Sequence, residues 1–455
     1  MNAETPQNMR RFLILWIGQT ISLLGSGLTS FALGVWIYQQ TGEATPFALT
    51  VLFGTLPRIL LAPLGGSLAD RRNRKQIMLL ADTGNALITA AAASIALTGN
   101  LAVWNIYLLA AFGSVFAAFQ EPAFGASVVM LVPKKDLGRA SGLRNLSEAL
   151  GGLITPLLGG LLYGLIGLGG VMIIDFATYF FALGALLATR IPQPALTTPT
   201  GPAGRHRWLS DAAFGWRYLR QRPGLFGLLW YFALVNFLFN ITSVLLSPLV
   251  LSRNSATVLG AVQMAAGAGM LLGSLLMSAW GGPKRRILGT VGFIALAALG
   301  VILVGARPSP WVIGAGFALL LFAIPLSSGS TQAIFAGKVA PDVQGRVFAI
   351  RSMIAQSMMP IAFLLAGPLA DRVFEPLTQT GGALAASPLG ALIGSGVGRG
   401  MGLMFVLSGL ILLVVSALAW GNPRIRNIEA ELPDSQVEEA PMVEAGAAEP
   451  AAAAG

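Results

Sequence analysis

The ten residues Gly66-Ser67-Leu68-Ala69-Asp70-Arg71-Arg72-Asn73-Arg74-Lys75 form a short polar segment between two long apolar runs. Each of these runs is long enough to cross a bilayer, which takes about 20 predominantly apolar residues. The segment ends in a basic cluster, and basic loops collect on the cytoplasmic side of a membrane. It therefore predicts a tight cytoplasmic turn and sets the orientation of both flanking helices.

The composition of the whole chain is that of a membrane protein. Of the 455 residues, 55% are hydrophobic and only 11% are charged, whereas soluble domains carry about 25% charged residues. The mean hydropathy is +0.73. The first apolar run is too long for a signal peptide and lacks a small-residue cleavage site, so we interpret it as the first span. We expect an all-α integral membrane protein with twelve spans, at residues 12–38, 46–69, 77–98, 103–132, 145–166, 169–189, 225–250, 257–281, 287–306, 310–336, 347–370 and 400–420.

The net charge of +10 follows the expected topology. Of the 29 Lys and Arg residues, 24 fall on one side of the expected spans, counting Arg351 near the start of the eleventh span. Four fall on the other side, and Arg58 lies deep within a span. This asymmetry predicts a multi-pass protein of the cell membrane with both termini in the cytoplasm. Because topology explains the charge, we expect the lipid bilayer as a partner and no nucleic acid.

A weak internal repeat divides the chain. Pro133 to Arg139 follows the fourth expected span and Pro341 to Arg346 follows the tenth, and their Gly-Arg pairs lie 207 residues apart. This spacing predicts two pseudo-symmetric six-helix bundles, as in transporters built from parallel repeats. We expect an N-terminal bundle, a cytoplasmic linker with an amphipathic helix, a C-terminal bundle and a disordered acidic cytoplasmic tail, at residues 1–190, 191–223, 224–421 and 422–455 respectively.

The expected linker helix has one apolar face and scattered arginines. A basic amphipathic helix beside a membrane lies in the headgroup layer, so we interpret it as a connector on the inner surface. The single histidine, His206, lies in the same linker, so a proton relay would have to be built from carboxylates. The face is formed by Trp208, Leu209, Ala212, Ala213, Trp216 and Leu219.

The opening segment resembles the loop signature Gly-x-Leu-Ala-Asp-Arg-x-Gly-Arg-Lys of the major facilitator superfamily, with Asn73 in place of a glycine. Asn tolerates a left-handed backbone better than most residues, so this departure is mild. Further similarities occur at Leu15 to Gln19, Gln120 to Ala123, Ile174 to Phe176, Gly215 to Leu219 and Gln344 to Val347. Together they are similar to the macrolide-efflux-like branch of the drug:proton antiporters.

The resemblance implies the major facilitator fold and a monomeric secondary transporter. Such a protein would export a small amphiphilic or drug-like compound by alternating access, in exchange for protons. The alternatives are sodium coupling, a proton-coupled uptake permease, and a passive facilitator for a small metabolite or lipid-like solute.

The resemblance also implies a role for the basic loop. Its members Gly66, Asp70, Arg71, Arg74 and Lys75 would hold the two halves together at the cytoplasmic side while the protein faces outward. The alternative is a solvated basic loop with no gating role.

Span five carries Gly151-x-x-x-Thr155-Pro156-x-x-Gly159-Gly160, which resembles the antiporter signature Gly-x-x-x-Gly-Pro-x-x-Gly-Gly with Thr155 replacing a glycine. Small residues let helices approach closely, and proline bends a helix. Gly151, Pro156, Gly159 and Gly160 therefore support export, although ordinary helix packing explains the same residues equally well.

Ionisable residues inside the spans are functional candidates, because a charge within a bilayer is costly. Arg58 precedes the inner surface by about 18 Å and Glu121 by about 20 Å at the helical rise, so the two residues lie at the same depth. Burial raises the proton affinity of a carboxylate and a guanidinium lowers it. We therefore expect Glu121 to carry the proton with Arg58 as its counter-ion, or the two to form a structural ion pair.

Three other carboxylates are weaker candidates. Asp175 is a second candidate for proton coupling, or it accepts hydrogen bonds from hydroxyls such as those of Thr178 and Tyr179. Asp82 and Glu148 lie near basic loops, so we interpret them as structural partners of cytoplasmic cations.

The substrate cavity is expected among spans one, four, seven and ten of the implied fold. Its candidate residues are Gln19, Asn236, Asn240 and Gln332, among mostly aliphatic neighbours. An apolar cavity with scattered hydrogen-bonding groups suits an amphiphilic small molecule.

Catalysis by this chain is not expected. It has one histidine and no cysteine, which excludes disulfides and thiolate metal sites. No Gly-x-x-x-x-Gly-Lys-Ser/Thr loop for binding ATP occurs in the sequence. We therefore expect no catalytic residue, no metal and no cofactor.

Overall fold

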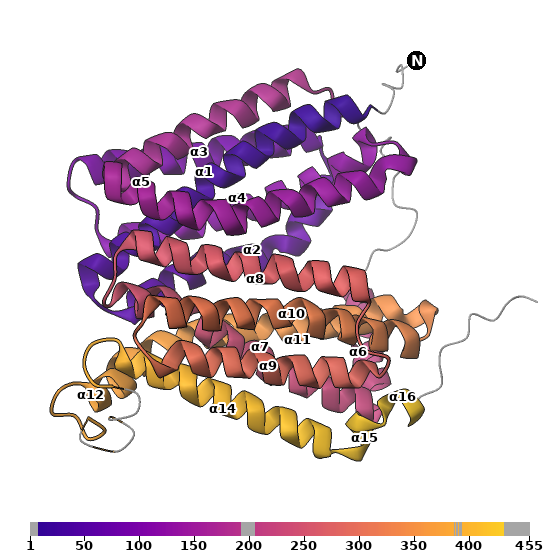
Figure 1. Cartoon of the computed structure of the whole chain (residues 1–455). Coiled ribbons are helices and arrows are strands. Elements are labelled where there is room, and N and C mark those ends of the chain that lie inside the picture. The colour runs from indigo at the N-terminus through magenta and orange to yellow at the C-terminus, as the bar shows by residue number, and fades with distance from the viewer. Residues whose placement is uncertain (1–7, 193–204, 386, 388–389, 391–393, 432–455) are drawn as a thin grey trace, which may run out of the picture.

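The computed structural model describes residues 8–192, 205–385, 387, 390 and 394–431. Throughout these ranges the regular structure is helical, and no strand occurs in them. Figure 1 shows one group of helices from α1 to α5 and a second from α7 to α14, with α6 lying across one end of the second group. The long helices are α1 Met9–Thr41, α2 Ala44–Arg71, α3 Arg74–Leu97, α4 Val103–Leu131, α5 Leu137–Ala188, α6 Arg205–Arg220, α7 Pro223–Leu251, α8 Ala256–Trp280, α9 Arg286–Ala306, α10 Pro310–Lys338, α11 Pro341–Leu369 and α14 Arg399–Gly421.

Five short segments complete the described chain. The π-helical turn η2 continues α11 without a break into α12. The segments are η1 Lys134–Asp136, η2 Ala370–Phe374, α12 Glu375–Thr378, α15 Pro423–Arg426 and α16 Ile428–Glu431.

The helix α5 contains two membrane-crossing arms. Gly167 interrupts it with φ 65° and ψ −176°, a backbone conformation that is open essentially only to glycine. Leu143 on the first arm accepts a hydrogen bond from Trp16, and Ala185 on the second arm packs against Gly18. Because both ends of α5 reach the same end of α1, the arms run antiparallel. The eleven apolar helices long enough to span a membrane in the described chain thus provide twelve crossings, as the sequence predicts.

Helix starts and stops follow ordinary capping rules. Asn73 and Ser255 cap α3 and α8 by accepting hydrogen bonds from backbone N–H groups of the first turn. Proline occupies the first position of α7, α10 and α11, where its missing N–H costs nothing. Pro341 therefore starts α11 six residues before the expected span at 347.

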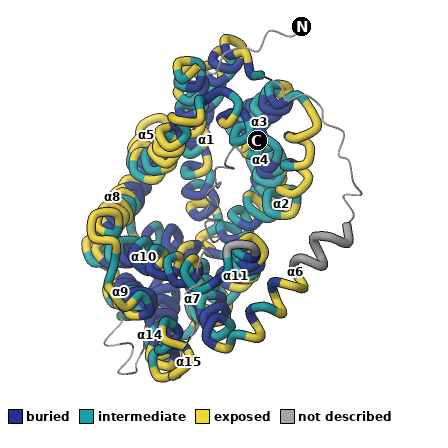
Figure 2. Tube along the Cα trace, turned by 90° about the vertical axis from the view of Figure 1, so that its right-hand side faces the viewer, coloured by how far each residue is buried: buried dark blue, intermediate teal, exposed yellow. Residues whose placement is uncertain are grey.

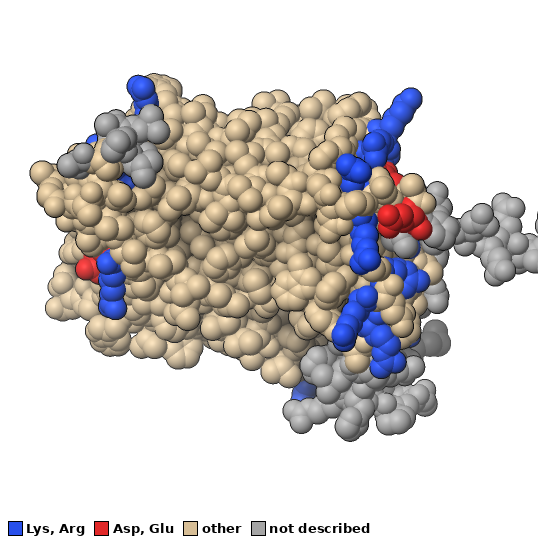
Figure 3. All heavy atoms as spheres, turned by 90° about the horizontal axis from the view of Figure 1, so that it is seen from below, with Lys and Arg blue, Asp and Glu red and all other residues tan. Residues whose placement is uncertain are grey.

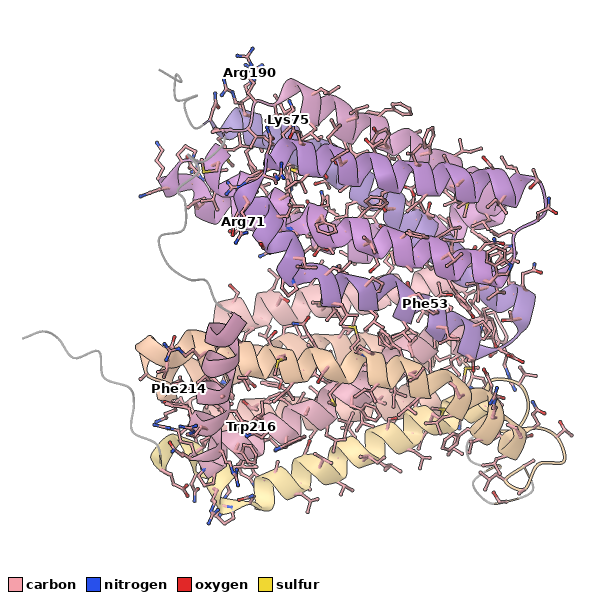
Figure 4. All side chains as sticks on the ribbon, turned by 180° about the vertical axis from the view of Figure 1, so that it is seen from behind. Phe53, Arg71, Lys75, Arg190, Phe214 and Trp216 are labelled. Carbon is pink, nitrogen blue, oxygen red and sulfur yellow. The ribbon has the colours of Figure 1, made fainter. Side chains whose placement is uncertain are left out.

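The two ends of the molecule differ in charge. The basic end, as we call it, carries the α2–α3 turn and α6, and Figure 4 shows Arg71, Lys75 and Arg190 there together with Phe214 and Trp216 of α6. The opposite end, here the far end, carries the α1–α2 and α11–α14 connections. Figure 3 shows Lys and Arg gathered near the two ends of one face with an uncharged band between them. Such a band is the surface that a bilayer requires.

The linker helix and the tail differ in part from expectation. In α6, Leu219 is buried, but Trp216 is 37% exposed and packs edge-on against Phe226 of α7. The side chains of His206, Trp208, Leu209 and Ala212 lie outside the described residues, as do residues 193–204 and 432–455. The start of the tail is ordered, because Ile425 and Ile428 are buried and Glu429 accepts hydrogen bonds from the first N–H groups of α9.

Contacts between the two halves gather toward the far end. A Cβ added at Gly160 would collide with the backbone of α8 at Ala256, and one added at Gly260 would collide with the backbone of α5 at Pro156. The two helices thus touch through their backbones there, as small residues allow in membranes.

Candidate functional site

Two hollows face each other across the centre of the bundle. One, of about 600 Å³, lies in the N-terminal half and is here called the N-wall cavity. The other, of about 490 Å³, lies in the C-terminal half and is called the C-wall cavity. Figure 2 shows α1 and α4 on one side of the central space and α7, α10 and α11 on the other. The N-wall cavity is lined by Trp16, Gln19, Thr20, Ser22, Leu23, Ser26, Arg58, Asp82, Asn85, Ala117, Gln120, Glu121, Phe124, Arg144, Ser147 and Glu148.

The central feature of the N-wall cavity is an ion pair between α2 and α4. Arg58 Nη1 lies 2.7 Å from Glu121 Oε1. The side chains of Arg58 and Glu121 are 43% and 57% exposed, so the pair faces the cavity rather than the protein interior. The Arg58 backbone N–H also donates to Ser114 of α4, which holds the two helices in register. The structure thus brings together the two residues that the sequence places at one depth.

A chain of three polar side chains lies beside this pair. Gln120 Nε2 donates to Gln19 Oε1 over 2.8 Å, and Gln19 Nε2 donates to Asp82 Oδ2 over 2.8 Å. The chain joins α4, α1 and α3 along the cavity wall. Asp82 is therefore a cavity residue bound to an amide, and not the partner of a cytoplasmic cation that its position in the sequence suggests.

Asp175 has different surroundings from Glu121. It is only 5% exposed, and its carboxylate accepts hydrogen bonds from Ser26 of α1 at 3.2 Å and Thr89 of α3 at 3.3 Å. Thr178 donates instead to the backbone oxygen of Asp175, and Tyr179 bonds to Thr83. Hydroxyls do surround Asp175 as the sequence suggests, but those that bind its carboxylate come from other helices.

The C-wall cavity has one charged side chain, Arg351, among its described lining residues, whereas the N-wall cavity has five. Asn236, Ser328 and Gln332 line the C-wall cavity, together with Phe232, Phe348 and Arg351. Asn236 and Asn240 each donate an amide hydrogen to a backbone oxygen of their own helix, four residues back. Of the candidate residues, Asn236 and Gln332 line this cavity and Asn240 does not.

The antiporter-like segment lies where the halves meet. Gly151, Thr155 and Pro156 line a smaller cavity of about 270 Å³, together with Ser247 and Gln263 of the other half. Gly159 packs against Phe31 of α1, and Gly160 packs against the start of α8. The segment therefore lies between the two halves, on the side of the far end.

A polar contact closes the far end. Asp371 in η2 accepts hydrogen bonds from the backbone N–H groups of Ala44 at 2.9 Å and Thr45 at 2.7 Å, and from the Thr45 hydroxyl at 2.5 Å. These N–H groups begin α2, where the preceding residue Glu43 makes no side-chain cap. The C-terminal half thus supplies the N-cap of a helix of the N-terminal half.

The sequence profile of the Major Facilitator Superfamily matches residues 15–363. This chain belongs to the major facilitator superfamily. It is therefore a membrane transport protein and not an enzyme.

Several relatives of this superfamily member carry the names of exporters. The chain is 28% identical over 371 residues to macrolide efflux protein A of Streptococcus pyogenes, covering 80% of this chain and 90% of that protein. It is 26% identical over 372 residues to multidrug efflux pump Tap of Mycolicibacterium fortuitum, covering 79% and 88%. It is 27% identical over 325 residues to enterobactin exporter EntS of Escherichia coli O1:K1 / APEC, covering 69% and 74%.

Solved structures show the same fold. A bacterial homologue of the human lysosomal transporter Spinster, in an inward-facing and unoccupied conformation, matches with a TM-score of 0.68 at 16% identity, covering 94% of this chain and 99% of that one. The superfamily fold, with helices packed in two groups, agrees with the architecture expected from the sequence.

The signature loop of the superfamily makes contacts within the N-terminal half. Arg74 is 8% exposed and donates to the backbone oxygens of Ala69 and Ala126, and Lys75 donates to those of Leu187 and Thr189. These contacts hold the N-terminal half together at the basic end. Asp70 and Arg71 are exposed, and Gly66 is half-buried. A gating role of the loop would therefore rest on Asp70 and Arg71, which are exposed.

Asp82, Glu148 and Arg351 line the cavities, although the sequence pattern does not single them out. Asp82 and Glu148 lie within about two turns of a cation, which suggests structural partners of cytoplasmic cations, and Arg351 lies near the start of its expected span. The signal that could have found Asp82 is its depth, because it lies eight residues into α3. Arg351 lies ten residues into α11, which also places it well inside the span.

Proposed function

We propose that the chain exports small amphiphilic compounds by alternating access, in exchange for protons. The observation that carries this proposal is the Arg58–Glu121 pair, an ion pair between two helices on the wall of a central cavity. The names of the relatives favour export over uptake. The transported compound would reach the cavity from the basic end, and the proton would reach it from the far end.

The proton site proposed here is Glu121. A carboxylate beside a guanidinium binds a proton weakly, and the same carboxylate binds one more tightly when the guanidinium moves away or the surroundings become apolar. Arg58 and Glu121 lie on different helices, α2 and α4, so a small shift between these helices would change the N–O distance of 2.7 Å. Asp82 is a second carboxylate that opens on the same cavity.

The contacts between the halves support alternating access. Asp371 caps α2 at the far end, while Asp70 and Arg71 are exposed at the basic end. With the basic end in the cytoplasm, as the charge asymmetry predicts, this conformation is closed to the outside and open to the inside. Both termini and α6 would then be cytoplasmic.

The experiment that tests this proposal uses inverted membrane vesicles with an acidic interior. Each of three probes (erythromycin, ethidium and 8-anilinonaphthalene-1-sulfonate) is added, and proton release is followed with a pH-sensitive dye. We expect at least one probe to release protons from vesicles that contain the transporter, and Glu121→Gln to abolish this release. The ion pair is about half exposed, and such pairs stabilise a fold by about 0–1 kcal/mol, so the variant should still fold.

The matched control is Glu148→Gln. Glu148 is an exposed carboxylate on the same cavity wall, and it has no ion-pair partner among the described residues. Its variant should keep proton release. Equal proton release from wild type and Glu121→Gln would exclude Glu121 as the proton site. Probe transport that is driven by a sodium gradient and not by a proton gradient would identify sodium as the coupling ion.

A further inference from the structure

We propose that Arg351 is an anion-binding residue of the C-wall cavity, and that the transported compounds include amphiphiles bearing a carboxylate or sulfonate. This inference rests on the proposed function in one respect, because it takes the central cavity as the site where the substrate binds. The proposal follows from the position of Arg351, from the groups that hold its guanidinium, and from the absence of a counter-charge among the described residues.

Arg351 lies deep in the molecule for a cation. It follows the start of α11 at Pro341 by ten residues, which is about 15 Å along a helix. A charged residue at such a depth is costly and is usually retained for binding or transport. Arg351 lines the C-wall cavity together with Phe232, Gln332 and Phe348, so its guanidinium opens on the central space rather than on lipid.

The guanidinium is held in place by neutral groups. Arg351 Nη1 donates to Gln332 Oε1 over 3.3 Å. Its central carbon lies 4.8 Å from the centre of the Phe335 ring and 5.9 Å from that of Phe232, within the range of cation–π attraction. The side chain is thus oriented in advance, and its remaining N–H groups have no hydrogen-bond partner among the described residues.

Within the described part of the chain, no counter-charge accompanies Arg351. Among the described residues it has no ion-pair partner, in contrast to Arg58, whose partner Glu121 lies 2.7 Å away. The charged groups of the opposite wall are Arg58, Asp82, Glu121, Arg144 and Glu148, and they belong to the N-terminal half. A guanidinium without a counter-charge suits an anion, because its fork matches the two oxygens of a carboxylate or sulfonate.

The rest of the C-wall cavity suits the apolar body of such a ligand. Phe232, Phe348, Leu229 and Ile354 line it, and Ser328 and Gln332 add hydrogen-bonding groups to the same cavity. The ligand expected here combines one acidic group with an aromatic or aliphatic body. The anion would then bind in the C-wall cavity and the proton in the N-wall cavity.

The test compares two dyes that share one aromatic scaffold. 8-Anilinonaphthalene-1-sulfonate carries a sulfonate, and N-phenyl-1-naphthylamine is the same molecule without it. Binding to the purified transporter in zwitterionic lipid discs is measured by energy transfer from its tryptophans, and the signal from empty discs is subtracted. We expect Arg351→Gln to weaken saturable binding of the sulfonate at least tenfold and to change binding of the neutral dye less than twofold.

Two further variants make the result decisive. Arg351→Lys keeps the charge but loses the fork, so it should bind the sulfonate with intermediate affinity. Arg222→Gln removes a similar arginine, stacked 3.6 Å from the Tyr218 ring at the basic end, and it should bind both dyes as the wild type does. The proposal is overturned by unchanged sulfonate binding in Arg351→Gln, by a parallel loss of both dyes, or by no saturable sulfonate binding to the wild type.

This binding test is independent of proton exchange. If Arg351→Gln loses the sulfonate while Glu121→Gln still exchanges protons, the anion site stands and the proton site fails. If Glu121→Gln abolishes proton exchange while Arg351→Gln binds the sulfonate as the wild type does, the proton site stands and the anion site fails.

Discussion

Glu121 and Asp175 are both carboxylates within spans, but their surroundings give them different chemistry. Glu121 is 57% exposed to the cavity and its ion-pair partner Arg58 lies on another helix. Asp175 is 5% exposed and is held by hydroxyls of α1 and α3. A group that exchanges protons with water during transport must be reached by water, so the geometry favours Glu121 over Asp175.

Replacing Asp175 should therefore affect stability rather than coupling. Asp175→Ala leaves the hydroxyls of Ser26 and Thr89 without their acceptor in a buried position, which costs about 1–3 kcal/mol. We expect a lower thermal midpoint in lipid discs, with proton release in inverted vesicles retained per folded molecule. A variant that folds normally but has lost proton release would instead make Asp175 a proton site.

At the scale of elements, the end of α2 and the junction of α11 with η2 share a short sequence pattern. Gly66-Ser67-Leu68-Ala69-Asp70-Arg71 closes α2 at the basic end, and Gly367-Pro368-Leu369-Ala370-Asp371-Arg372 runs from α11 into η2 at the far end. Both read Gly-x-Leu-Ala-Asp-Arg. In this structure Asp371 caps the first turn of α2, whereas Asp70 is exposed. The two aspartates thus occupy related positions in the two halves, and only the far-end aspartate bridges the halves here.

Removing the far-end cap should shift the conformational balance. Asp371→Ala deletes two hydrogen bonds to backbone N–H groups and one to the Thr45 hydroxyl, so conformations with an open far end should become more populated. Spin labels at Gln40 and Gln379, which are exposed at the far end of the two halves, should report longer distances by electron–electron resonance.

The matched control is Glu43→Ala. Glu43 precedes α2 at the same end but makes no side-chain cap. Its distance distribution should equal that of the wild type. A distribution unchanged by Asp371→Ala would mean that the backbone contacts of α5 and α8 alone keep the far end closed.

At the scale of the whole molecule, charge asymmetry predicts which end faces the cytoplasm. The chain contains no cysteine, so single cysteines can be introduced without background. Arg217→Cys on α6 and Gln379→Cys at the far end both replace exposed residues. With a membrane-impermeant maleimide, we expect labelling of Gln379→Cys in right-side-out vesicles and of Arg217→Cys in inverted ones. The opposite pattern would place the basic end outside and reverse the direction proposed for transport.

Much of this architecture can be predicted from the sequence, because a bilayer restricts the backbone structures that can span it. A span needs about 20 apolar residues and must satisfy its own backbone hydrogen bonds, so apolar runs map directly onto helices. The helical rise converts position into depth, which is why Arg58 and Glu121 could be paired from their distances to basic loops. The kink at Gly167 also falls between two expected spans, at residues 145–166 and 169–189.

The amino-acid sequence by itself determined the helical membrane fold, the superfamily, the charge asymmetry and the depth of each buried charge, because these depend on composition and distance along one chain. Only the tertiary structure decided which side chains meet across helices. It placed Asp82 beside Gln19, separated Asp175 from the cavity, left Arg351 without a counter-charge among the described residues and joined Asp371 to α2. The physical reason is that contacts between helices depend on rotation and tilt, which small residues such as Gly160 and Gly260 permit but do not specify.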